Sequence, residues 1–78
     1  MERSAFVEEI ERRVRLRTAR TYVELGLRTR LRCRELPAEL MEVIGREMDQ
    51  TTLDRWVVGT FTIDTLDQAR ALLGLPSP

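Results

Sequence analysis

The sequence predicts an all-α protein in which one long N-terminal helix is followed by three short helices forming a small cap. No proline interrupts residues 1–36, where the only glycine is Gly26. Apolar residues recur at spacings of three and four, which is typical of helices with one buried face. Start and stop signals divide the rest of the chain into three short segments. We expect an arginine-rich long helix over residues 1–35, which serves as an association segment, a helical cap over 36–75 and a frayed tail over 76–78.

The long helix is expected to begin near Ser4 and to end before Pro37. A serine hydroxyl can accept a hydrogen bond from an unpaired N–H at a helix start. The residue before a proline is disfavoured in the helical region, so the helix should stop there. Between these ends, Arg, Glu, Leu and Ala lose little rotamer freedom in a helix. Gly26 leaves two alternatives open: a helix that continues through it, or a break at which the chain folds back.

Two sets of apolar residues lie on this helix, and they do not share one straight line. The first set is Phe6, Val7, Ile10 and Val14. The second set is Ala19, Val23, Leu27 and Leu31, flanked by Leu16, Tyr22 and Leu25. A heptad that starts at Val7 meets Arg17 and Glu24, so the pattern is too short for a coiled coil of three or four clean heptads.

The length of the helix predicts self-association. A helix of about 30 residues is about 45 Å long, whereas a compact chain of this size has a radius of gyration of about 11–12 Å. The residues after Pro37 cannot cover such a helix from end to end. The first apolar set would then face water unless another chain covered it. We therefore predict a homodimer or higher oligomer whose self-association residues are Phe6, Val7, Ile10 and Val14.

Each cap helix has a start signal of its own. The second helix is expected from Pro37 to a point between Ile44 and Met48, followed by a polar connector over 49–52. Thr51 is expected to cap the third helix, and Asp64 to start the fourth. Gly74 should cap the end of the fourth helix. The predicted core of the cap is Leu36, Leu40, Val43, Ile44, Leu53, Trp56, Val57, Phe61, Leu66, Ala69, Leu72 and Leu73.

Charge is divided unevenly along the chain, although the net charge is zero. Residues 1–34 hold ten Arg and five Glu, which gives +5, and residues 35–78 hold three Arg and eight carboxylates, which gives −5. This asymmetry has three readings: a nucleic-acid footprint, attraction between the two halves, or a solvated helix face. The candidate nucleic-acid contacts are Arg28, Arg30, Arg32 and Arg55.

Residue types needed for most catalytic and metal chemistry are missing. The chain has no histidine, no lysine and a single cysteine, Cys33. Histidine acid–base chemistry, Schiff bases and thiolate metal clusters therefore have no residues to use. We expect no enzyme activity, no metal and no cofactor. No apolar run approaches the roughly 18–20 residues of a membrane span, and the lone cysteine suits a reducing cytosol. We therefore expect a cytoplasmic protein with no membrane partner.

One stretch of the chain resembles a known family. The stretch LRTRLRCRELPAELMEVIGREMDQTTLDRWVVGTFTIDTLDQARALLG has an arginine-rich helix ending before Leu36-Pro37, then Leu53-x-x-Trp56, then a helix that includes Leu66. This pattern resembles the C-terminal helical tail, a domain of unknown function, of bacterial PD-(D/E)XK-type putative transposases, or recombination-promoting nucleases. The nuclease core of that family needs an acid-x-lysine motif, which this chain lacks. The resemblance therefore implies an accessory or oligomerising tail, free-standing or belonging to a larger protein partner.

Residues 39–61 also resemble a helix-turn-helix, which is the alternative interpretation. Val43, Met48, Leu53 and Trp56 fall near the apolar spacings of that motif, with a reading helix that begins near Thr51. Against this interpretation, Glu47 stands where the turn favours glycine. The region is also net negative, whereas DNA binding depends on neutralising phosphates.

Overall fold

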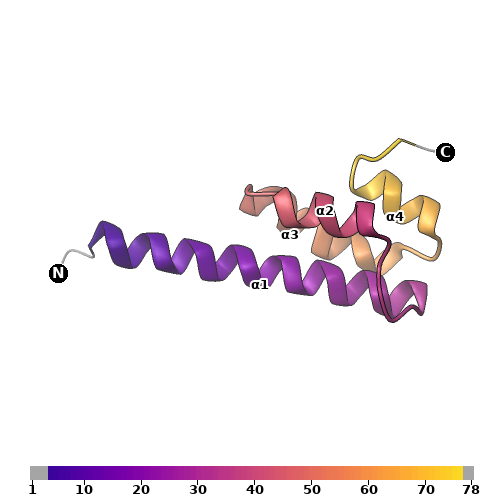
Figure 1. The fold of residues 1–78 in the computed structure, drawn as a ribbon, viewed down its shortest axis with the longest axis horizontal. Coiled ribbons are helices and arrows are strands. Elements are labelled where there is room, and N and C mark those ends of the chain that lie inside the picture. The colour runs from indigo at the N-terminus through magenta and orange to yellow at the C-terminus, as the bar shows by residue number, and fades with distance from the viewer. Residues whose placement is uncertain (1–3, 77–78) are drawn as a thin grey trace.

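The computed structural model describes residues 4–76, and these residues form a wholly helical protein (Figure 1). The elements are α1 (Ala5–Leu31), α2 (Ala38–Arg46), α3 (Gln50–Gly59), the 3₁₀ turn η1 (Thr60–Thr62) and α4 (Leu66–Leu72). The predicted fold class is confirmed: one long helix precedes three shorter α-helices. The protein measures 50 × 22 × 19 Å and its radius of gyration is 14.1 Å. It is therefore more extended than the compact globule of about 11–12 Å expected for this chain length.

Helix α1 runs without a break through Gly26, so the folded-back alternative is wrong. Ser4 caps it as predicted, because its hydroxyl accepts a hydrogen bond of 3.1 Å from the Val7 amide. Gly26 serves close packing: a Cβ built at this position would lie 2.5 Å from Thr60 Oγ1, so the missing side chain lets η1 approach the helix. The glycine that raised the question of a bend therefore marks the contact between α1 and η1.

Helix α1 ends several residues earlier than the predicted end before Pro37. The helix stops at Leu31, because Arg32 adopts the left-handed conformation with φ 55°. The amides of Arg32 and Cys33 both donate to the carbonyl of Arg28, which closes the helix end in the usual way. The chain then turns so that Leu36 enters the core before Pro37.

The core lies between the cap and the part of α1 from Leu16 onward, which follows about three turns of the helix. Its α1 members come from the second apolar set of the sequence, at spacings of three and four. Trp56, predicted to be core, is buried. The buried apolar residues are Leu16, Ala19, Val23, Leu27, Leu36, Leu40, Ile44, Leu53, Trp56, Ile63, Ala69 and Leu73.

Two predicted core residues, Phe61 and Leu66, are exposed, and Ile63 takes an inward position in their place. The cause is η1, since a 3₁₀ turn repeats every three residues and brings Thr60 and Ile63 to the same side. Phe61 then points outward and is 69% exposed. Leu66 stands in the first turn of α4, where it lines a surface hollow together with Leu31.

The starts of all three cap helices differ from the prediction by one or two residues. Pro37 is the residue before α2 and not its first residue, although the end of α2 at Arg46 is as expected. Asp49, not Thr51, caps α3: its carboxylate accepts hydrogen bonds from the Thr51 amide and the Thr52 hydroxyl. The predicted connector therefore already contains the first turn of α3.

Helix α4 begins after Thr65 and not after Asp64. Thr65 Oγ1 accepts a hydrogen bond from the Gln68 amide, and the Gln68 side chain accepts one from the Thr65 amide. This reciprocal pair is a capping box. At the other end, Gly74 has φ 79° and follows the helix as predicted. The predicted fraying at residues 77–78 falls outside the described residues.

Candidate functional site

The N-terminal part of α1 extends beyond the cap, as Figure 1 shows. We call this part, Ala5–Arg15, the overhang, because the first buried residue of α1 is Leu16. Its eleven residues are about 16 Å long at 1.5 Å per residue. All four predicted self-association residues lie on it and are exposed, Phe6 at 74% and Val14 at 55%. The overhang is therefore an amphipathic helical segment whose apolar side chains remain exposed.

Ion pairs between described residues of the overhang run along the helix. Glu9 bridges Arg12 at 2.9 Å and Arg13 at 3.0 Å. The hydrogen bond from Arg12 is the first cause, and that from Arg13 the second, of a pKa of Glu9 below its ordinary value. These pairs stabilise the exposed helix only modestly, because solvent screens charges at the surface.

Five exposed side chains of α1 form one oblique row. Its members stand four residues apart, and each step of four turns about 40° around a helix of 3.6 residues per turn. The row therefore starts on the outer side of the overhang and winds towards the cap further along α1. We call this row the ridge; it consists of Phe6, Ile10, Val14, Thr18 and Tyr22.

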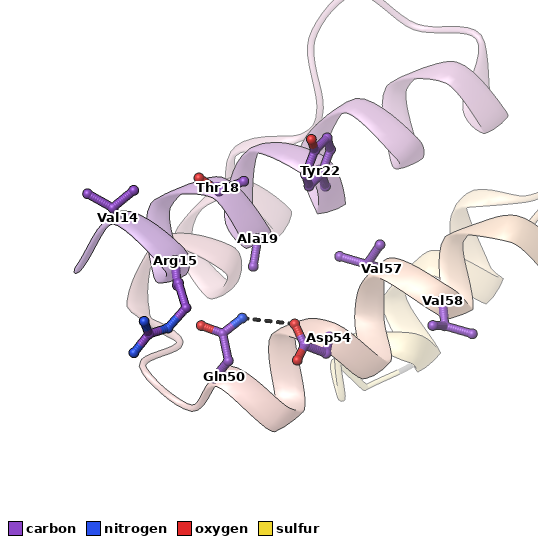
Figure 2. A pocket seen from close by; sticks show the side chains of 9 residues that line it. All are labelled: Val14, Arg15, Thr18, Ala19, Tyr22, Gln50, Asp54, Val57 and Val58. Carbon is purple, nitrogen blue, oxygen red and sulfur yellow. Dashed lines mark hydrogen bonds between the residues drawn. The ribbon is translucent and has the colours of Figure 1, made fainter. Parts of the chain in front are cut away.

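The ridge ends in an apolar groove between α1 and α3. Two adjoining hollows of about 540 and 250 Å³ share Tyr22 and Val57 and together make this groove. Figure 2 shows the larger hollow, with Val14 and Tyr22 on the α1 side, Val57 and Val58 on α3, and a hydrogen bond from Gln50 to Asp54 at one end. The residues that line the two hollows are Val14, Arg15, Thr18, Ala19, Tyr22, Leu25, Gly26, Thr29, Arg30, Gln50, Asp54, Val57, Val58, Thr60 and Phe61.

Two arginines of α1 hold the cap in place. Arg20 donates from Nη2 to the carbonyl oxygen of Glu47 at 2.7 Å. Arg30 donates from Nε to the Ile63 carbonyl oxygen at 2.8 Å and from Nη2 to Asp64 at 2.8 Å. Both arginines join the basic helix to backbone carbonyls at turns of the acidic half. Attraction between the two halves, one of the readings of the charge asymmetry, is therefore present within a single chain.

The four predicted nucleic-acid contacts do not form one surface. Arg28 and Arg32 line a shallow hollow of about 430 Å³ together with Arg34. Arg30 is engaged with Ile63 and Asp64. Arg55 lies exposed on α3, outside that hollow. The structure therefore brings two of the four together and assigns a third to the packing of the cap.

Among residues 4–76, no group of three or more His, Cys, Asp or Glu side chains is arranged to hold a metal ion. Cys33 is half-buried and not in a disulfide. No helix in the described part of the chain is long and apolar enough to cross a membrane. Comparisons with protein-family models, curated proteins and solved structures found no match for this chain.

Proposed function

We propose that this protein is a non-enzymatic self-association module that forms a homodimer or higher homo-oligomer through the overhang. One observation carries the proposal: Phe6, Val7, Ile10 and Val14 are all exposed on the segment of α1 that precedes its first buried residue, Leu16. A helix of this length has little stability alone in water, and its usual support is the packing of an apolar face. A second chain supplies that packing.

Covering the exposed apolar residues of the overhang contributes favourable free energy to association. A buried phenylalanine removes about 150–250 Å² from water. Phe6 is 74% exposed, so covering it contributes about 1–2 kcal/mol, since complete burial of a phenylalanine side chain contributes about 1.5–3 kcal/mol. The three aliphatic residues add to this gain. Against it stand the association costs of about 4–15 kcal/mol, so the whole apolar set must take part.

The resemblance to the helical tail of transposase- and nuclease-like proteins suggests a setting for the module. An accessory tail that pairs with a second copy would bring two larger protein partners together. We place this activity in the cytoplasm, where the half-buried Cys33 would stay reduced.

Size-exclusion chromatography with light scattering tests the proposal on two charge substitutions. Ile10→Glu puts a carboxylate into the overhang, and we expect it to convert the protein to a monomer at about 10 µM, where micromolar complexes begin to dissociate. Met41→Glu is the matched control, since Met41 is an exposed apolar residue on α2. The control should keep the mass of the unmodified protein. Equal masses for the two variants would contradict the proposal.

Nucleic-acid binding is the second candidate, and the basic hollow at the end of α1 supports it. Arg28, Arg32 and Arg34 line that hollow. This candidate predicts duplex binding at about 50 mM salt that weakens steeply as salt rises. Arg28→Glu and Arg32→Glu should abolish the binding, whereas Arg46→Glu on α2 should not.

A further inference from the structure

The ridge of α1 has a symmetry that fits a second copy of the same chain. Val14 stands at its centre, with Ile10 and Thr18 four residues away on either side and Phe6 and Tyr22 eight residues away. When rows of this kind from two helices interdigitate, the helices cross at about −50°, the commonest crossing in globular proteins. A row centred on one residue can pair with itself across a twofold axis at that residue.

We infer that the partner is a second copy bound antiparallel, with each overhang laid across the α1–α3 groove of the other copy and the twofold axis at Val14. The inference rests on the proposed self-association and adds the site that receives the overhang. In this arrangement Val14 meets its own counterpart, Ile10 meets Thr18, and Phe6 meets Tyr22. Each copy donates an overhang and accepts one, as a twofold interface requires.

The two surfaces match in length and in chemistry. The overhang of eleven residues is about 16 Å long. The α1 side of the groove extends from Val14 to Thr29, which is about 22 Å. The groove offers apolar side chains that the core does not use, above all Val58 at 65% and Phe61 at 69% exposure. An apolar helix face of this size can therefore lie within the length of the groove.

The exposed apolar area is what a stable dimer needs. Phe6, Val7, Ile10 and Val14 on the overhang continue into Tyr22, Leu25, Val58 and Phe61 at the groove. Together they offer on the order of 700–800 Å² per copy, against about 800 Å² per partner in a standard interface. The whole set thus has the size of an interface.

Parallel pairing uses this surface less completely. It would place Phe6 beside Phe6 and Ile10 beside Ile10, so each overhang would cover the other overhang. Val58 and Phe61 would then stay in water, and both grooves would stay open. Antiparallel pairing covers the overhang and the groove in one step.

Cysteine cross-linking separates the two arrangements. In a Cys33→Ser background, Ile10→Cys and Thr18→Cys are made as single variants, treated separately and as a mixture with a short bifunctional thiol reagent. We expect a cross-linked dimer from the mixture and little from either variant alone. Self-cross-linking of Ile10→Cys in a dimeric protein would overturn the antiparallel arrangement while leaving self-association in place. A monomeric parent protein would overturn both.

A substitution in the groove gives a second measurement that does not involve cysteine. Val58→Glu changes an exposed residue on α3, far along the chain from the overhang, so the monomer should still fold. We expect the dimer dissociation constant to rise at least about tenfold. Met41→Glu again serves as the control and should leave the constant unchanged. A dissociation constant that is unchanged by Val58→Glu would show that the groove is not the site of contact.

Discussion

Replacing Gly26 by alanine tests the closest contact in the fold. A Cβ at this position would lie 2.5 Å from Thr60 Oγ1 and 2.9 Å from Thr60 Cβ. Thr60 has little room to move, because it is buried and its hydroxyl donates to the Val57 carbonyl at 2.7 Å. Overpacking of this kind costs about 1–3 kcal/mol. The gain in helix propensity from Gly to Ala, about 1 kcal/mol, offsets part of that cost.

The net result should be a destabilisation of about 1 kcal/mol, up to about 2 kcal/mol if the backbone cannot adjust. Gly45 supplies the matched control, since it lies inside α2 and a Cβ there meets no atom within 4 Å. Gly45→Ala should raise the free energy of unfolding by about 0.5–1 kcal/mol through propensity alone. The same substitution is therefore expected to have opposite signs at the two glycines.

Urea unfolding followed by far-ultraviolet circular dichroism measures both variants, at one fixed protein concentration because a dimer's stability depends on it. Adding Thr60→Ala to Gly26→Ala should recover part of the loss, because it removes the Oγ1 and Cγ2 contacts but keeps the Cβ contact. A Gly26→Ala variant that is stabilised as much as Gly45→Ala would refute the close approach of η1 to α1.

Three other predictions follow from single residues. Asp49→Ala should lower the free energy of unfolding by about 1 kcal/mol through the lost N-cap, whereas Thr51→Ala should change it by less than about 0.5 kcal/mol; the reverse order in urea unfolding would restore Thr51 as the cap. Leu53 is fully buried, so Leu53→Ala should cost about 2–5 kcal/mol in the same assay, and a loss below about 1 kcal/mol would place this side chain outside the core. The pKa of Glu9 is lowered by Arg12 first, so its stabilising effect is present above the ordinary glutamate range of about 4.3 and is lost as pH falls through the lowered pKa. Arg12→Gln should move the titration of the Glu9 carboxylate, followed by NMR, to higher pH, and an unchanged midpoint would contradict the pair.

The sequence was sufficient to predict the helices because each has a local signal. Ser4 caps α1, Gly74 follows α4, and the apolar spacing of α1 separates its core side from its exposed side. Trp56 was assigned correctly to the core, since a large apolar residue at helical spacing is usually buried. These features depend on neighbours in the sequence and need no knowledge of the tertiary fold.

The wrong predictions lie at positions where contacts between residues far apart in the sequence determine the local structure. Phe61 was placed in the core because the pattern of α3 was continued through it, but η1 changes the period from 3.6 to 3. Gly26 looked like a break because its partner, Thr60, lies 34 positions later. The choice between Asp49 and Thr51 as cap depends on which side chain reaches the first amides of α3, and both types are good caps.

The candidate site was predicted only in part, and for the same reason. The overhang, one of the two parts of the site, could be predicted from the length of α1 and from the apolar spacing at Phe6, Val7, Ile10 and Val14. The groove half needs α3 beside α1, which no local pattern reveals. Val58 follows Trp56 and Val57, both of which pack in or against the core, so the third successive apolar residue of α3 turns away from that face.

The mass of the unmodified protein in solution tests the central claim most directly. Sedimentation equilibrium at about 100 µM and physiological salt covers dissociation constants up to the high micromolar range. If the overhang binds a second copy, the average mass at this concentration lies clearly above the 9.1 kDa of one chain, rises towards at least twice that value at higher concentration, and falls on dilution. A mass of 9.1 kDa at this concentration would show that the overhang stands uncovered in water, and self-association would be excluded.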